Sequence, residues 1–130
     1  MKNISRVSSN FDYFKEVGLL KMKLRSNKKE SNPAKTMRAA ERLLKKGDLD
    51  VAALYFWSAG NNFRENKEYE LSANAYERAA YCHSSEDHWE RAVEDYLSAS
   101  NMYELAGSSL KATAMKGNAE KMKMLQNEET

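Results

Sequence analysis

The feature that most constrains this 130-residue chain is a pattern of small and large side chains with a period of 20 residues. Small residues recur in two phases of the period, and large residues recur in three. Small columns let neighbouring helices approach closely, and large columns fill the space between them, as in stacked helical repeats. The columns are Ala39, Ala59, Ala79, Ala99 and Ala119; Ala52, Ser72, Ala92 and Ala112; Phe56, Tyr76 and Tyr96; Leu43, Phe63, His83, Tyr103 and Lys123; and Leu49, Tyr69 and Trp89.

Short polar joints divide this region into segments of helical length. Asn32 precedes Pro33, which is typical of an N-cap followed by the first helical residue. Gly47 follows two lysines, which is typical of a helix C-terminus, and we expect Asp48 to cap the next helix. We expect the two serines of the joint over residues 84–87 to act as caps as well. The predicted helices are 33–46, 49–65, 68–83, 87–106 and 109–126.

These segments predict an all-α fold. Connections this short force sequential helices to pack antiparallel, which favours a helical-hairpin solenoid of the tetratricopeptide-like superhelical kind, although the period differs from that of the tetratricopeptide repeat. The repeat domain covers residues 33–126. An N-terminal extension over residues 1–32 holds one further candidate helix at 11–24, and we expect residues 127–130 to be a frayed tail.

The amino-acid composition excludes some classes of function and of location. The chain has 21 basic and 19 acidic residues, so it lacks the large basic excess of a nucleic-acid-binding protein. Its single cysteine, Cys82, cannot form an internal disulfide, which favours a reducing compartment. No apolar run approaches the roughly 20 residues needed to span a bilayer. We therefore expect a cytoplasmic protein that does not bind nucleic acid.

The sequence offers little for catalysis or metal binding. His83 and His88 lie close to Cys82, but a zinc site needs four converging ligands and the chain has no second pair. His83 also stands in the column of Phe63 and Tyr103, so we expect it to pack between helices. The chain has no glycine-rich phosphate loop and no persuasive Ser-His-Asp order. We expect no enzymatic activity, no cofactor and no metal.

Most aromatic residues stand in the repeat columns, where interhelical packing is the expected role. Tyr55, Trp57 and Tyr81 lie off the main columns. Two interpretations stay open for these three: packing, or exposed anchors for a partner, since Trp and Tyr are enriched in binding hot spots.

Residues 21–46 hold ten basic residues and two acidic ones. One interpretation is a solvated linker and helix face, and the other is attraction to anionic lipid or to an acidic partner helix. Aromatic and leucine side chains close to this basic segment suggest an interfacial anchor. The candidate residues for this membrane contact are Phe11, Phe14, Leu19 and Leu20.

The span from Ala39 to Gly107 contains the strings AAERLLKKGDLDVAALYFWSAGNNFRENKEYELSANAYERAAYCH and HWERAVEDYLSASNMYELAG. These strings resemble the soluble NSF attachment proteins, the SNAP family. The resemblance implies a right-handed stack of antiparallel helix pairs. It also implies an adaptor that grips a SNARE four-helix bundle and recruits the ATPase that takes the bundle apart.

In a SNAP-like stack, basic residues on one broad face would meet the acidic surface of the helical bundle. We expect no counterpart here of two features of the family: the C-terminal bundle that stimulates the ATPase, and an aromatic membrane loop between the first two helices. The candidate partner-binding residues are Arg64, Lys67, Arg78 and Arg91.

A generic tetratricopeptide-like scaffold subunit of a larger complex stays open as the alternative function. It predicts that one terminal helix lacks a polar outer face. We expect this surface on the last helix, at Met115, Met122, Met124 and Leu125.

Overall fold

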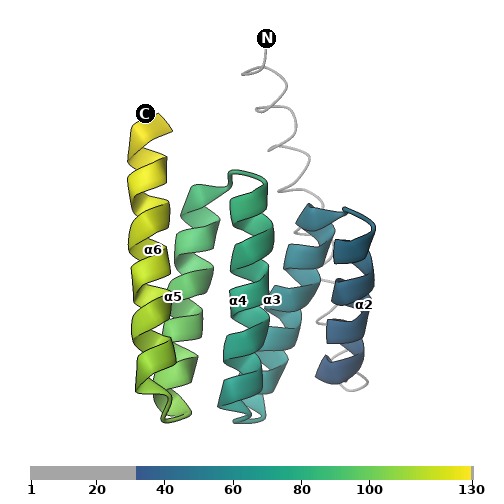
Figure 1. The fold of residues 1–130 in the computed structure, drawn as a ribbon. Helices are drawn as coiled ribbons and strands as arrows, with labels where there is room; N and C mark the ends of the chain where they lie inside the picture. The colour runs from purple at the N-terminus through teal and green to yellow at the C-terminus, as the bar shows by residue number, and fades with distance from the viewer. Residues whose placement is uncertain (1–31, 130) are drawn as a thin grey trace. The chain divides into compact units, whose positions relative to one another are not determined.

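The computed structural model describes residues 32–129, which belong to the second of two compact units, Asn32–Thr130. These residues form five helices and no strand (Figure 1), which confirms the all-α class. The predicted helix at 11–24 and the candidate membrane-contact residues lie outside the described residues. The helices are α2 (Pro33–Lys45), α3 (Leu49–Glu65), α4 (Tyr69–Ser85), α5 (Trp89–Leu105) and α6 (Ser109–Glu129).

The helices of this unit stand side by side in chain order, and their connections alternate between the two ends (Figure 1). Extensive packing occurs only between sequential neighbours: α2 with α3, α3 with α4, α4 with α5, and α5 with α6. The core of the described unit consists of three clusters of apolar side chains. One is shared by α4, α5 and α6, and the other two are shared by α2, α3 and α4.

The repeat columns form these interfaces. Ala59, Ala79, Ala99 and Ala119 have no exposed surface, and neither do the four members of the column that begins with Ala52. Phe56 and Tyr76 are also buried, whereas Tyr96 is half-buried. From α3 to α6 this alanine column is excluded from water, as close packing of helix on helix requires, whereas its first member, Ala39 of α2, is half-buried.

All four helix-to-helix joints have the same backbone turn. The amide of Asp48 donates to the carbonyl oxygen of Leu43 at 3.0 Å, and the equivalent bond recurs at 20-residue intervals, as in a Schellman motif. The residue before each donor has a positive φ. These residues are Gly47 (84°), Lys67 (62°), Asp87 (59°) and Gly107 (82°).

The helix starts agree only partly with the prediction. Asn32 caps α2 as expected, because its Oδ1 accepts from the amides of Ala34 and Lys35 at 3.0 and 3.4 Å. The prediction for Asp48 was wrong: its side chain makes no capping bond, and its backbone carbonyl accepts from the amide of Ala52 instead.

The serines of the joint over residues 84–87 do not cap the next helix either. The hydroxyls of Ser84 and Ser85 both donate to the carbonyl of Tyr81 at 2.9 Å, so they belong to the last turn of α4. As a result α4 ends two residues later than predicted, and α5 begins two residues later. At the other end of the chain, α6 continues to Glu129, so residues 127–129 are helical rather than frayed.

On one side, the last helix is polar at positions where the earlier helices are mostly apolar. Thr113, Lys116 and Glu120 of α6 are exposed and polar. A polar outer face is what a terminal repeat needs in contact with water. The equivalent residues of α3, α4 and α5 are buried, except that Tyr96 is half-buried. The buried ones are Ala53, Ala73 and Val93; Phe56 and Tyr76; and Gly60, Ala80 and Ser100.

The apolar surface predicted on the last helix is confirmed for two of its four residues. Met115 is buried and belongs to the cluster shared by α4, α5 and α6, and Met122 is half-buried. Met124 and Leu125 are exposed.

Gly60 marks a close approach between α3 and α4. The hydroxyl of Ser72 donates to its carbonyl at 2.7 Å, and an added Cβ at Gly60 would lie 2.8 Å from Cε1 of Tyr76. The Tyr76 ring is buried, and its hydroxyl donates to Asn61, so it has little room to move. An added Cβ at Gly117 of α6, in contrast, would meet nothing within 4 Å.

This contrast predicts opposite effects of one substitution at two mid-helix glycines. Gly117→Ala should raise the free energy of unfolding by about 0.5–1 kcal/mol, because alanine is the better helix former. Gly60→Ala should lower it by about 1–3 kcal/mol, because overpacking against Tyr76 outweighs that gain. Urea denaturation of both variants and the parent measures the two effects. Stabilisation by both substitutions would contradict the close approach at Gly60.

Candidate functional site

The four predicted partner-binding residues do not converge on one patch. Arg64 lies in the last turn of α3 and Lys67 in the joint that follows, so these two share one end of the unit. Arg91 lies in the first turn of α5, at the opposite end. Because a 17-residue helix is about 25 Å long, Arg91 is separated from the first two by roughly that length.

Arg78, in the middle of α4, connects two helices of the unit. Its guanidinium forms a two-point contact with the carboxylate of Glu41 on α2, with 3.1 Å between Nε and Oε1. It also lies 5.5 Å from the centre of the Phe56 ring. Both partners of the ion pair are partly exposed, so the pair positions α2 against α4 more than it stabilises the fold.

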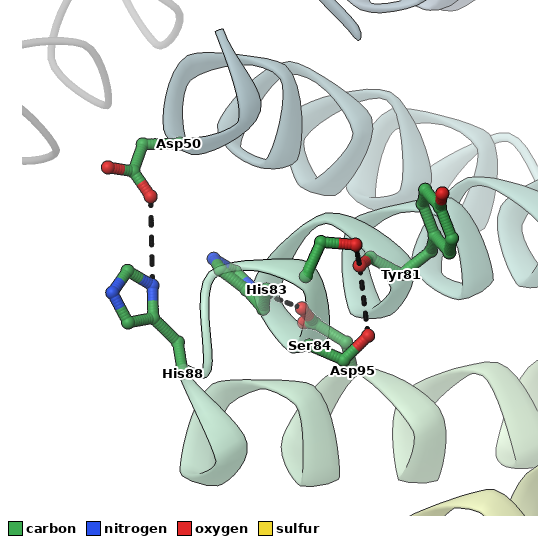
Figure 2. Close-up of polar contacts among 7 residues, drawn as sticks. Asp50, Tyr81, His83, Ser84, His88 and Asp95 are labelled. Atoms are coloured by element: carbon green, nitrogen blue, oxygen red, sulfur yellow. Dashed lines mark hydrogen bonds and ion pairs between the residues drawn. The ribbon is translucent and has the colours of Figure 1, made fainter. Parts of the chain in front are cut away.

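A second polar group joins α4 and α5 in the interior. Nδ1 of His83 lies 2.8 Å from Oδ2 of Asp95, and both side chains are buried (Figure 2). Because an ionised carboxylate only accepts, His83 donates through Nδ1–H when Asp95 is charged. The sequence placed His83 in a packing column, and its burial confirms that. Its partnership with Asp95 was missed.

A longer contact lies beside this pair. Nδ1 of His88 is 3.6 Å from Oδ1 of Asp50, an ion-pair distance longer than a good hydrogen bond (Figure 2). The imidazole rings of His83 and His88 have centres 6.1 Å apart. Three helices therefore contribute to one polar cluster near the joint of α4 and α5: α3 through Asp50, α4 through His83, and α5 through Asp95.

Burial shifts the pKa values of three groups in and beside this cluster. It raises the pKa of Asp95, and the hydrogen bond from His83 opposes part of that shift. Burial lowers the pKa of His88, and the carboxylate of Asp50 acts in the opposite direction. In the turn next to it, burial raises the pKa of Glu86, with Asp50 and Asp87 adding to the effect.

The nucleophilic side chains next to the cluster in the chain are bonded elsewhere or buried. The hydroxyl of Ser84, next to His83 in the chain, donates to a backbone carbonyl of its own helix. Within residues 32–129 no three His, Cys, Asp or Glu side chains converge as metal ligands. Cys82 is fully buried, and burial raises its pKa to about 11, so its thiolate is disfavoured at neutral pH.

The His83–Asp95 pair occupies two positions that the 20-residue repeat elsewhere fills with apolar residues. One period earlier the same two positions hold Phe63 and Ala75, which pack together between α3 and α4. One period later they hold Tyr103 and Met115, which belong to the cluster shared by α4, α5 and α6. A buried polar pair thus replaces an apolar contact at one interface of the stack. The signal in the sequence was a His and an Asp 12 residues apart, in columns that are otherwise mostly apolar.

The off-column aromatics divide into two groups. Tyr55 and Trp57 are half-buried against the core clusters, which supports packing for them. Tyr81 on α4 is 53% exposed, which leaves it available as an anchor for a partner.

Comparisons of the chain with protein-family models, with curated proteins and with solved structures found no match. None of the helices among the described residues is both long and apolar enough to cross a membrane.

A double-mutant cycle tests the interpretation of the buried pair. His83→Phe alone should lower the free energy of unfolding by about 3–5 kcal/mol, because it leaves the buried Asp95 carboxyl without its partner. Asp95→Ala alone should cost about 1–3 kcal/mol by leaving the imidazole unsatisfied. The double variant recreates the Phe63–Ala75 contact and should return close to the parent. Additive losses in urea denaturation would show that the pair does not replace a packing contact.

Proposed function

We propose that the chain is a non-enzymatic, SNAP-like adaptor that binds helical-bundle proteins, with SNARE proteins of vesicle traffic as the partner class. In this proposal the helices continue the antiparallel hairpin arrangement of a solenoid, and partners bind along its outer surface. The observation that carries the proposal is the repeated use of one set of columns at successive interfaces. Such stacks function by presenting an extended surface.

The buried polar cluster supports a binding role over a catalytic one. His83 and Asp95 occupy positions whose repeat equivalents are apolar packing residues. Both side chains are buried, so a substrate in solution has little access to them. General acid–base chemistry requires the titrating group to reach the substrate directly or through one water.

The end of the unit near the α3–α4 joint offers the better partner surface. Arg64 and Lys67 are both exposed there, and Leu71 in the first turn of α4 is 48% exposed. An exposed leucine beside two cations combines an apolar contact with charge that would steer an acidic partner helix.

A variant of this surface tests the proposal without weakening the fold. Lys67→Gly removes the charge and places glycine where the backbone has a φ of 62°, so the turn should become more stable. Combined with Arg64→Gln, it should weaken binding to a purified SNARE four-helix bundle roughly tenfold. Isothermal titration at low and high salt measures the affinity.

The matched control is Lys121→Gln with Lys123→Gln on α6, which removes the same charge from exposed positions elsewhere. The control should bind as the parent does. Equal binding by all three proteins, or no binding by the parent, would contradict the proposal.

A scaffold subunit of a larger complex is the second candidate function. Leu105 and Leu110, on either side of the α5–α6 joint, are 59% and 89% exposed. Such a pair of apolar side chains suits a lasting contact with another subunit. Loss of assembly in a Leu105→Gln, Leu110→Gln variant, with SNARE binding absent from the parent, would favour this function.

A further inference from the structure

The outward side of α2 carries a row of basic side chains. Their spacings of three and four residues place them on one face of the helix. All of them are exposed, and the row extends from the first turn of α2 to its C-cap. The basic row consists of Lys35, Arg38, Arg42, Lys45 and Lys46.

No carboxylate of the described residues neutralises this row. Glu41, the acidic residue of α2, is paired with Arg78 of α4. On α6, in contrast, three of the four basic side chains are paired: Lys111 with Glu70, Lys116 with Glu104, and Lys123 with Glu120. The basic row is therefore a concentrated positive charge with no counter-charge among the residues that the structure describes.

The remaining described chain has the opposite charge. Residues 33–46 hold five basic residues and one acidic residue, whereas residues 47–129 hold eight basic and fifteen acidic ones. An anionic surface would attract α2 and repel the other helices. This asymmetry would orient the unit with α2 toward that surface.

The basic row lacks an apolar anchor. The large hydrophobic side chains that are exposed in the described residues lie on α4, α5 and α6, and those of α2 are half-buried against the core. A specific protein interface usually depends on a buried apolar or aromatic anchor. Attraction to a diffuse layer of anionic headgroups requires only clustered basic residues.

We propose that the basic row of α2 binds anionic lipid headgroups at a membrane surface. This contact is independent of the partner surface near the α3–α4 joint, because it uses another helix and another kind of ligand. Each basic residue near an anionic leaflet strengthens binding, so removal of three should lower the vesicle partition coefficient on the order of 100-fold.

Vesicle co-flotation of the full 130-residue chain tests this. The vesicles contain phosphatidylcholine alone, or phosphatidylcholine with phosphatidylserine. The test variant carries Lys35→Gln, Arg38→Gln and Arg42→Gln, and the matched control carries Lys116→Gln, Lys121→Gln and Lys123→Gln on α6. Circular dichroism verifies that both variants remain helical.

The parent and the α6 control should float with the phosphatidylserine vesicles at low salt, and the α2 variant should not. Rising salt should release the parent, since exposed charges are screened. The proposal is overturned if the parent floats equally with neutral vesicles, if both variants lose flotation equally, or if the parent does not float. Binding of a glutamate-rich helical peptide without flotation would also overturn it and would point to a protein partner.

Discussion

The close approach of neighbouring helix backbones is the constraint on which the rest of this structure depends. Two serines show how close the helices come: Ser72 donates to the carbonyl of Gly60 at 2.7 Å, and Ser100 donates to the carbonyl of Ala112 at 2.8 Å. A short hydroxyl side chain reaches the backbone of the next helix only if little lies between them. The alanine columns provide that space, and the aromatic columns fill what remains.

The same constraint separates the polar groups of the unit into two kinds. Inside the stack, the buried side chains of His83 and Asp95 bond to each other, and one interface thereby differs from its neighbours. Outside, basic side chains gather on α2 while acidic ones outnumber them over the other helices. The interior pair affects how α4 and α5 pack together, and the exterior charges affect which surfaces the unit attracts.

Much of the fold could be predicted because its causes are local. Regular columns, an Asn-Pro start and a Gly turn are visible in the sequence, and the bounds predicted for α3 were confirmed. The end of α4 could not be predicted, because Ser84 can cap a following helix or bond back to its own, and Asp87 adopts a positive φ that usually favours glycine. Prediction of the His83–Asp95 contact would need the alignment of α4 with α5. Prediction of the Arg78–Glu41 pair would need to show that side chains of α4 and α2 reach each other past α3.

The most direct test of the account is the equilibrium stability of variants in which a larger residue replaces an alanine of the columns. Ala59→Leu and Ala79→Leu each place a large side chain at a position with no exposed surface, whereas Ala114→Leu does so at an exposed position of α6. The account predicts that each buried substitution lowers the free energy of unfolding by about 1–3 kcal/mol or more. It predicts that the exposed substitution changes it by less than about 0.5 kcal/mol. Equal stability of all three variants would contradict close helix packing through these columns.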